Sequence, residues 1–385
     1  MKGRSPKDKH FYRDVVVLLI LVMAAIAMLG EVSRQNWNSK VTAFPTKTEA
    51  DVKNRAEQLL DQMTLEGKIT QMFLVTCPDE ETRQVIEAYQ FGGVLFEEGD
   101  FADRSKNSLK SDIEDWQSVS NVAMFTAVME EGGSVSPMSS HKAFRNAAFL
   151  SPSDMYATGG MTLVEGEAEE KYELLSSLGL NMNLGIVCDL ATEETALMYE
   201  RSLRRDEKTA GRYVAANVSA ASEQNVVSAL KHFPGYGNAE FTDEGYGVND
   251  RSVETLEALD LLPFESGIEA DVPAVMLANS IVTAVDGEKP ACLSREVNKL
   301  LRRELGFEGL IITDAPEIAS LKKFAQDGQV AVTAIKTGCD LLIVTDYETE
   351  LNNVLAAVRE GELAEERIDE SVLRILQLKI KYGIL

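Results

Sequence analysis

The chain has 385 residues, of which 38 are Lys or Arg and 62 are Asp or Glu, giving a formal net charge of −24 at pH 7. Binding to nucleic-acid phosphates requires a basic face, so this composition argues against a nucleic-acid partner. Apolar residues make up 45% of the chain and charged residues 26%, which is typical of a globular protein rather than a disordered one. The length fits one large α/β barrel or two medium-sized domains.

The N-terminal segment differs from the rest of the chain. Residues 1–14, "MKGRSPKDKHFYRD", are basic, and residues 15–30, "VVVLLILVMAAIAMLG", carry no charge. Basic residues before an apolar run keep the N-terminus in the cytoplasm, so we predict a signal anchor over 15–30. The protein is then a single-pass protein of the cell membrane, with an extracellular folded domain over 51–385 after a polar linker over 31–50. Cleavage after "AIA" (25–27) is the alternative, and it predicts a secreted protein.

Metal and disulfide chemistry have little support in the sequence. The four cysteines have no CxxC spacing and lie among apolar residues, which predicts buried free thiols. The chain has only three histidines, so no zinc site and no cofactor are expected. The cysteines are Cys77, Cys188, Cys292 and Cys339.

Short apolar runs alternate with helical patterns beyond residue 50. The runs are rich in β-branched residues and do not alternate with polar ones, which is typical of strands buried on both faces of a parallel sheet. Eight such runs over about 310 residues predict a single TIM-type (β/α)8 barrel, with a doubly wound open sheet as the alternative. The runs cover residues 69–75, 92–96, 122–128, 181–187, 226–233, 273–278, 309–315 and 340–344.

Polar side chains follow several of these runs, at the end of a parallel barrel where active sites form. Asp314 follows "GLIIT" and is read either as a nucleophile or sugar ligand, or as a cap of the next helix. Lys231 and His232 precede the glycine-containing loop "FPGYG". The other strand-end residues are Glu97, Glu98, Glu130, Glu131, Asp189, Asn279 and Asp346, with Arg201, Arg204 and Arg205 in a nearby loop.

Carboxyl groups cluster after the "FPGYG" loop, where Glu240, Asp243 and Glu244 follow within seven residues of Gly237. Retaining glycoside cleavage needs a nucleophilic and a proton-donating carboxyl group roughly 5–5.5 Å apart. Asp314 and a carboxylate from this loop fit that requirement.

Several motifs, in this order, resemble glycoside hydrolase family 3, in particular its single-domain bacterial β-N-acetylhexosaminidases. They are "LLDQMTLEGKITQMF", "GGVLF", "MEEGGSV", "ERSL", "LKHFPGYG", "PAVMLANSIV", "LSREVNKLLRRELGFEGLIITDA" and "RIDESVLRILQLKIKYGIL". The resemblance extends over residues 51–385 and implies a TIM-type barrel. It also implies a retaining hydrolase that cleaves terminal β-linked N-acetylhexosamine, for example in cell-wall peptidoglycan.

The resemblance assigns roles residue by residue. Asp314 matches the catalytic nucleophile, which forms a covalent glycosyl-enzyme. Lys231 and His232 match a sugar-binding pair, and Arg201 in "ERSL" matches a sugar-binding arginine. Glu131, in "MEEGG", and Asn279, after "VMLA", complete the expected substrate-binding set.

The sequence departs from the family pattern where relatives carry an Asp/His dyad that serves as acid and base. The corresponding positions here are Phe241 and Asp243, and no histidine lies between 233 and 385. Asp243 is therefore the candidate acid/base, with Glu244 or Glu240 as alternatives. Five other family positions are also replaced: a sugar-binding Asp by Met129, two Arg by Ser134 and Pro137, and a Ser-His pair by Ala278 and Asn279.

Three functions follow from these observations. The first is an active, membrane-anchored glycosidase. The second is a catalytically impaired member of the family that binds glycan or a cell-wall partner without turnover. The third is a structural or assembly protein whose anchor and acidic surface matter more than its pocket.

Overall fold

A computed structural model describes residues 48–77, 82–240, 242, 246–314, 321–325 and 329–385. Val52–Leu385 forms one compact unit, and Met1–Asp51 is assigned to a second. The predicted basic segment, the predicted anchor over 15–30 and nearly all of the predicted linker lie outside the described residues. Among the residues that the structure does describe, no helix has the length and apolar character needed to cross a bilayer.

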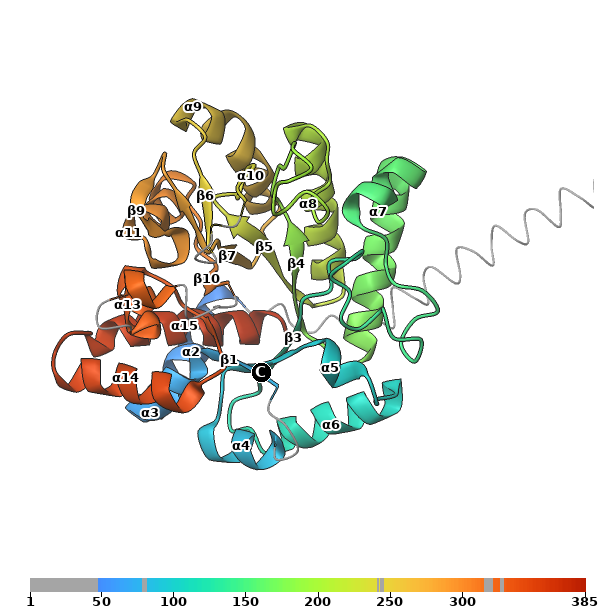
Figure 1. Ribbon diagram of the computed structural model, residues 1–385. Helices are drawn as coiled ribbons and strands as arrows, with labels where there is room; N and C mark the ends of the chain where they lie inside the picture. The colour runs from blue at the N-terminus through green and yellow to red at the C-terminus, as the bar shows by residue number, and fades with distance from the viewer. Residues whose placement is uncertain (1–47, 78–81, 241, 243–245, 315–320, 326–328) are drawn as a thin grey trace, which may run out of the picture. The chain divides into compact units, whose positions relative to one another are not determined.

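Eight strands form one sheet in the order β10-β7-β5-β4-β3-β2-β1-β11 (Figure 1). Every paired neighbour in this sheet is parallel. The end strands β10 and β11 also meet, because the amide of Thr313 donates to the carbonyl of Leu341 at 3.1 Å and that of Asp340 donates to Ile311 at 2.8 Å. The sheet is thus a nearly closed barrel. Its strands are β1 (Phe73–Thr76), β2 (Gly93–Phe96), β3 (Phe125–Val128), β4 (Met182–Val187), β5 (Val227–Phe233), β7 (Ala274–Leu277), β10 (Leu310–Thr313) and β11 (Leu342–Val344).

Helices separate the barrel strands along the chain, and Figure 1 shows α4, α6, α7, α8 and α10 on the outside of the sheet. This placement explains why the strands are apolar on both faces: one face meets the barrel interior and the other the helices. The helices are α2 (Glu49–Leu60), α3 (Leu65–Gln71), α4 (Thr82–Tyr89), α5 (Glu98–Phe101), α6 (Lys106–Ser118), α7 (Pro152–Ser177), α8 (Glu207–Glu223), α9 (Val253–Thr255), α10 (Leu261–Glu269), α11 (Arg295–Lys299), α13 (Val330–Thr337), α14 (Tyr347–Arg359) and α15 (Glu365–Lys381).

The eight predicted apolar runs each overlap one barrel strand. The prediction was wrong at the start of the first run, because residues 69–71 belong to helix α3 and β1 begins only at Phe73. Thr64 caps the start of this helix, since its side chain accepts a hydrogen bond from the amide of Gly67 at 3.1 Å. The apolar residues Ile69 and Met72 are buried as helix and turn residues rather than as strand residues.

A second, three-stranded sheet in the order β6-β8-β9 was not predicted. Its strands are β6 (Gly247–Asn249), β8 (Ser280–Val282) and β9 (Asp286–Pro290). Strands β6 and β8 follow β5 and β7 in the chain, so this sheet joins the loops after two neighbouring barrel strands. It gives the ends of those loops a fixed connection to each other.

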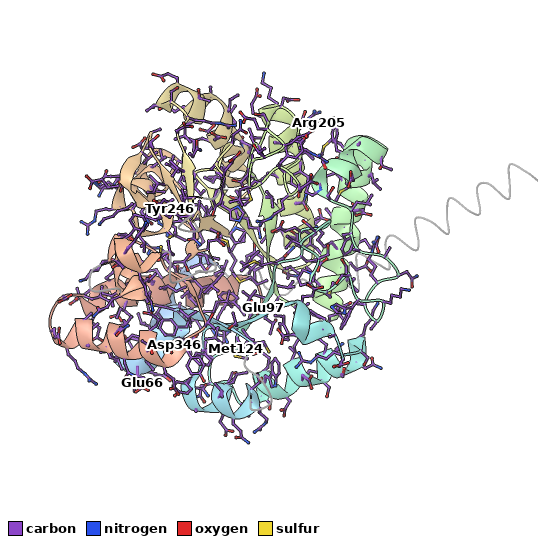
Figure 2. The ribbon with its side chains drawn as sticks, viewed as in Figure 1. Glu66, Glu97, Met124, Arg205, Tyr246 and Asp346 are labelled. Carbon is purple, nitrogen blue, oxygen red and sulfur yellow. The ribbon has the colours of Figure 1, made fainter. Side chains whose placement is uncertain are left out.

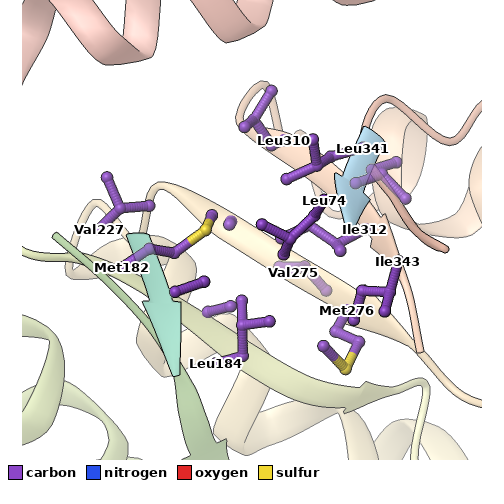
Figure 3. Packing of buried hydrophobic residues seen from close by; sticks show 14 of the residues in the cluster. Leu74, Met182, Leu184, Val227, Val275, Met276, Leu310, Ile312, Leu341 and Ile343 are labelled. Atoms are coloured by element: carbon purple, nitrogen blue, oxygen red, sulfur yellow. The ribbon is translucent and has the colours of Figure 1, made fainter. Parts of the chain in front are cut away.

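The barrel core is made of aliphatic side chains from many strands. Figure 3 shows Leu74, Leu184, Val275, Ile312 and Ile343 packed together, and each is at most 1% exposed. Burial of one such side chain contributes about 1.5–3 kcal/mol. The interior is therefore filled with side chains, and it holds the strand ends in place for the polar residues that follow them.

Candidate active site

The predicted site residues meet at the carboxyl ends of the barrel strands. Lys231 and His232 directly precede Phe233, the last residue of β5, and Asp314 directly follows β10. Glu131 lies three residues beyond β3, and Arg201 comes from the loop between β4 and α8. Parallel strands present their carboxyl ends on the same side of the barrel, which brings these residues together.

Glu131 binds two cations at once. Its carboxylate is completely buried and lies 2.5 Å from Lys231 Nζ. Arg201 donates to both of its oxygens, through Nε to Oε2 at 2.9 Å and through Nη2 to Oε1 at 2.7 Å. Such a two-point contact fixes the plane of the guanidinium group. Glu131 thereby positions the two cations that the sequence predicted as sugar ligands.

The charges of this trio depend on one another. Burial favours the neutral form of Glu131, but Lys231 and Arg201 outweigh burial and lower its pKa to about 2. Burial lowers the pKa of Lys231, although Glu131 opposes the shift. When both cations are protonated the trio carries one net positive charge, which suits contact with the oxygen-rich edge of an uncharged sugar or with a nearby carboxylate.

A second carboxylate, Asp189, holds the histidine. Asp189 lies just after β4, is 2% exposed, and accepts from the ring Nδ1 of His232 at 2.8 Å. The same oxygen accepts from the backbone amide of His232 at 3.1 Å. The other oxygen accepts from the backbone amide of Tyr236 at 2.8 Å. Gly235 has a φ of 119°, a conformation that favours glycine, and this turn lets the Tyr236 amide face Asp189.

Asp314 faces this cluster. Its Oδ2 lies 4.0 Å from His232 Nε2 and 3.5 Å from the hydroxyl of Tyr236, which donates to it. The side chain of Asp314 is 17% exposed, whereas that of Glu131 is completely buried. One carboxylate is therefore open to a ligand while the other is enclosed by cations. An accessible carboxylate among fixed hydrogen-bond donors is the arrangement that nucleophilic attack on a sugar requires.

Asn279 lies at the edge of this cluster. Its backbone amide donates to the hydroxyl oxygen of Tyr236 at 3.1 Å, and its side-chain oxygen accepts from Cys292 Sγ at 3.2 Å. These contacts tie the loop after β7 to the "FPGYG" loop. Its role as a sugar ligand remains a prediction.

The candidate acid/base residues are less well defined. Asp243, Glu244 and Phe241 lie outside the described residues. Glu240 is exposed, and the replaced family positions Met129 and Ser134 are partly buried and exposed, respectively. The identity of the proton donor therefore remains a prediction.

Other strand-end residues from the sequence cap helices instead. The backbone amide of Glu97 donates to Asp100 at 2.7 Å in the first turn of α5. Asp346 accepts from the amide of Thr349 at 3.2 Å at the start of α14. Figure 2 labels both Glu97 and Asp346. Glu130 accepts from Ser139 Oγ at 2.5 Å and so fastens the loop after β3.

Two residues of the cluster, Asp189 and Tyr236, were missing from the predicted site. Asp189 was recognised only as a polar residue after a strand, and Tyr236 only as part of the "FPGYG" loop. The position of Asp189 gave a signal, but its two hydrogen-bonded partners lie 43 and 47 residues away in sequence.

Within the described part of the chain, no group of three or more His, Cys, Asp or Glu side chains is arranged to hold a metal ion.

Comparison with known proteins decides the family. The model for the glycosyl hydrolase family 3 N terminal domain matches residues 64–378. The chain belongs to glycosyl hydrolase family 3. The resemblance inferred from the motifs is thereby confirmed, and the matched residues include every member of the cluster around Asp314.

Relatives within family 3 include hexosaminidases. A "Beta-hexosaminidase A" from Pseudoalteromonas piscicida is 27% identical over 347 residues, covering 80% of this chain and 56% of the relative. An "Uncharacterized secreted glycosyl hydrolase" from Arthroderma benhamiae is 34% identical over 216 residues, covering 53% of this chain and 61% of the relative. The chain thus spans about three fifths of the length of these curated relatives.

Solved structures share the fold. A family 3 β-N-acetylglucosaminidase from Paenibacillus sp. str. FPU-7 has a TM-score of 0.76 and 29% sequence identity, covering 84% of this chain and 63% of that one. The structure titled "M tuberculosis LpqI" has a TM-score of 0.75 at 22% identity and covers 84% of this chain and 96% of that chain. The second likeness concerns the fold alone. Together they support the barrel that the strand pattern predicted.

Proposed function

We propose that this chain is a retaining glycosidase that releases terminal β-linked N-acetylhexosamine from a glycan. One observation carries the proposal: the accessible carboxylate of Asp314 lies 4.0 Å from His232, beside the cluster of Lys231, Arg201 and Glu131. The hexosaminidase names among the relatives support the choice of sugar. The natural substrate class that we propose is cell-wall glycan outside the cell.

In the proposed mechanism, Asp314 attacks the anomeric carbon and forms a covalent glycosyl-enzyme while the leaving-group oxygen takes up a proton. Water then attacks the same carbon and releases the sugar with retained configuration. Lys231, His232 and Arg201 hold the sugar hydroxyls. Glu131 keeps the two cations in place, because a free buried Lys or Arg charge costs several kcal/mol.

The proton donor in this mechanism is a carboxylic acid rather than the histidine of other family members. We propose Asp243, with Glu244 and Glu240 as alternatives, because this loop follows Lys231 and His232 directly. An aspartic acid has a reference pKa of about 3.9, so it must be raised by burial or by a neighbouring negative charge to donate near neutral pH. Hydrolysis of substrates with good leaving groups depends less on proton donation to the leaving-group oxygen.

The test is hydrolysis of a panel of aryl glycosides by the purified full chain, with aryl β-N-acetylglucosaminide as the expected substrate. We expect Asp314→Asn to lower kcat by about 10³-fold or more, because the covalent step loses its nucleophile. Mass spectrometry after treatment with a fluorinated glycosyl donor should find a covalent adduct on Asp314. Wild-type turnover with an adduct on another residue would refute the assignment.

A matched control separates catalysis from folding. Asp346→Asn changes another strand-end aspartate, which caps α14 through the amide of Thr349. Asparagine caps helices about as well as aspartate, so this variant should retain wild-type activity.

A pH-rate profile that loses its basic limb in Asp243→Asn would support Asp243 as the acid.

A second candidate function is glycan binding without turnover. The sequence favours it because no histidine lies between 233 and 385 and the Arg positions of the family pattern are Ser134 and Pro137. In that case no aryl glycoside is hydrolysed and no adduct forms, yet N-acetylhexosamine oligosaccharides bind and stabilise the protein. Asp314→Asn would then leave binding nearly unchanged, in contrast to its expected effect on catalysis.

A further inference from the structure

We propose that Asp189 is a positioning residue that fixes the tautomer of His232 and the place of Tyr236, so that both present defined groups to the ligand beside Asp314. This inference rests on the proposed function for its link to turnover. The hydrogen bonds of Asp189 carry it, and neither the sequence nor the comparisons assign this residue a role.

Asp189 makes three hydrogen bonds with one short segment of chain. Its Oδ2 accepts from the amide and the ring Nδ1 of His232 at 3.1 and 2.8 Å, and its Oδ1 accepts from the amide of Tyr236 at 2.8 Å. The residue is 2% exposed, so water does not compete for these bonds. One carboxylate therefore clamps both ends of the turn from His232 to Tyr236.

The partners of His232 determine where its ring proton lies. A carboxylate only accepts hydrogen bonds, so the contact with Asp189 requires a proton on Nδ1. Arginine only donates, and Arg201 Nη2 lies 3.4 Å from Nε2 of His232, so Nε2 is the accepting nitrogen. The two contacts agree on one neutral tautomer. Nε2 lies 4.0 Å from Asp314, and its lone pair is suited to accept a hydrogen bond from a sugar hydroxyl in place of the 3.4 Å contact with Arg201.

The contact of Asp189 with the Tyr236 amide also affects Asp314, because the Tyr236 hydroxyl contacts that carboxylate. The hydroxyl of Tyr236 accepts from the backbone amide of Asn279 at 3.1 Å and donates to Asp314 Oδ2 at 3.5 Å. The Tyr236 ring also lies edge to face with the His232 ring, with centroids 5.1 Å apart. A shift of the Tyr236 backbone would therefore move a hydrogen-bond donor away from the predicted nucleophile.

Asparagine cannot replace Asp189 in this role. If its amide nitrogen faces His232, it must donate to Nδ1, which drives the ring proton to Nε2 and toward the Arg201 donor. If its oxygen faces His232 instead, its amide nitrogen opposes the amide of Tyr236 and that contact is lost. A carboxylate is thus the group that satisfies all three donors.

The experiment uses the purified full chain with 15N-labelled histidine. The chain has only three histidines, so a spectrum of His232→Gln identifies the His232 signals. Two-bond 15N–1H correlations show which ring nitrogen carries the proton. We compare wild type, Asp189→Asn and the control Asp346→Asn, and we measure kcat/KM and thermal unfolding for each.

We expect His232 to be protonated on Nδ1 in wild type and in Asp346→Asn, whereas Asp189→Asn either moves the proton to Nε2 or keeps it on Nδ1 and loses the contact with the Tyr236 amide. We also expect kcat/KM of Asp189→Asn to fall by about 100-fold or more, by comparison with other carboxylate–imidazole pairs. An Nε2–H tautomer in wild type would overturn the proposal. This measurement is made on the wild-type protein, so it does not depend on whether a variant folds. A folded Asp189→Asn protein with near-wild-type turnover would also overturn it.

The tautomer measurement separates this proposal from the proposed function. If wild type hydrolyses no glycoside but His232 changes tautomer in Asp189→Asn, then the glycosidase proposal fails and the positioning role of Asp189 stands. If wild type is active and its His232 is protonated on Nε2, the glycosidase proposal stands and the role of Asp189 is refuted.

Discussion

Lys231 and Lys379 are both fully buried, but they differ in the group that faces their ammonium nitrogen. Lys231 lies 2.5 Å from the carboxylate of Glu131. Lys379, in α15, donates to the neutral side-chain oxygen of Gln71 at 2.9 Å and lies 4.9 Å from the centroid of the Phe125 ring. Burial lowers the pKa of Lys379 to about 7. A buried lysine with a neutral hydrogen-bond partner makes stability depend on pH in a way that can be measured.

The pH dependence of Lys379 has a definite sign. Its pKa is about 7 when folded and about 10.4 when unfolded, so between these values the unfolded chain binds the proton and the folded chain does not. The free energy of unfolding should therefore rise with pH, by about 3 kcal/mol between pH 7 and pH 10 from this group. Lys379→Met should remove that rise. Urea unfolding of wild type and variant at both pH values measures the difference.

The control for this prediction lies on the same helix. Lys381 is exposed at the end of α15, so Lys381→Met should follow the pH dependence of wild type. Subtracting the two variants cancels the titration of other groups, including the many surface carboxylates. Parallel curves for Lys379→Met and wild type would show that Lys379 keeps its charge when folded.

At the level of elements, helix α15 holds the closure of the barrel. Asp340 lies just before β11 and is completely buried. Arg302 lies 2.5 Å from its Oδ2, Ser371 donates to its Oδ1 at 2.7 Å, and Arg374 lies 3.1 Å from Oδ1. The backbone amide of Ile311 in β10 also donates to Oδ2, at 3.1 Å. One carboxylate thus ties β10, the start of β11 and α15 together.

Removal of this carboxylate should destabilise the whole domain. Asp340→Ala leaves the cations around it without their counter-charge, and breaking such a buried pair costs about 3–5 kcal/mol. Chemical denaturation should show a lower midpoint with an unchanged slope. Glu366→Ala, an exposed change in the first turn of α15, should alter stability by no more than about 0.5 kcal/mol. A loss below 1 kcal/mol for Asp340→Ala would contradict this account.

The strands show how much of the fold the sequence could predict. Apolar runs located all eight barrel strands, because strands buried on both faces must be apolar throughout. The run that begins at Ile69 was misassigned at its start, since a buried helix end and a buried strand look alike in a short apolar run. Strands β6, β8 and β9 have three to five residues, and β9 contains charged residues, so they lack a recognisable pattern.

The site was predictable where a side chain follows a strand directly. Asp314, Lys231 and His232 were recognised for that reason and for their family motifs. The partners of Asp189 were not predictable, because the contact depends on how the loops after β4 and β5 fold toward each other. In the structure Glu131 faces Lys231 and Arg201, and its predicted contact with a sugar stays a prediction.

At the level of the whole molecule, the proposed activity belongs to the compact unit Val52–Leu385, whereas the proposed localisation depends on the N-terminal segment. The described part of the chain contains no helix suited to cross a membrane. We propose that residues 15–30, whose sixteen uncharged residues follow a basic segment, attach the protein to a membrane. This separation makes the localisation testable by removal of one segment.

The full chain should fractionate with membranes and resist extraction by high salt and alkaline carbonate, because an apolar span is held by the bilayer and not by charge. A chain that begins at residue 48 should be found in the soluble fraction with the same activity on aryl glycosides. A protease added to intact cells should degrade the domain, since basic residues before the span keep the N-terminus inside.

If the protein is instead released with a mature N-terminus just after Ala27, then residues 15–30 are a cleaved signal and the protein is secreted. Recovery of the full-length chain in the cytosol would contradict both localisations, and it would remove extracellular cell-wall glycan as the proposed substrate.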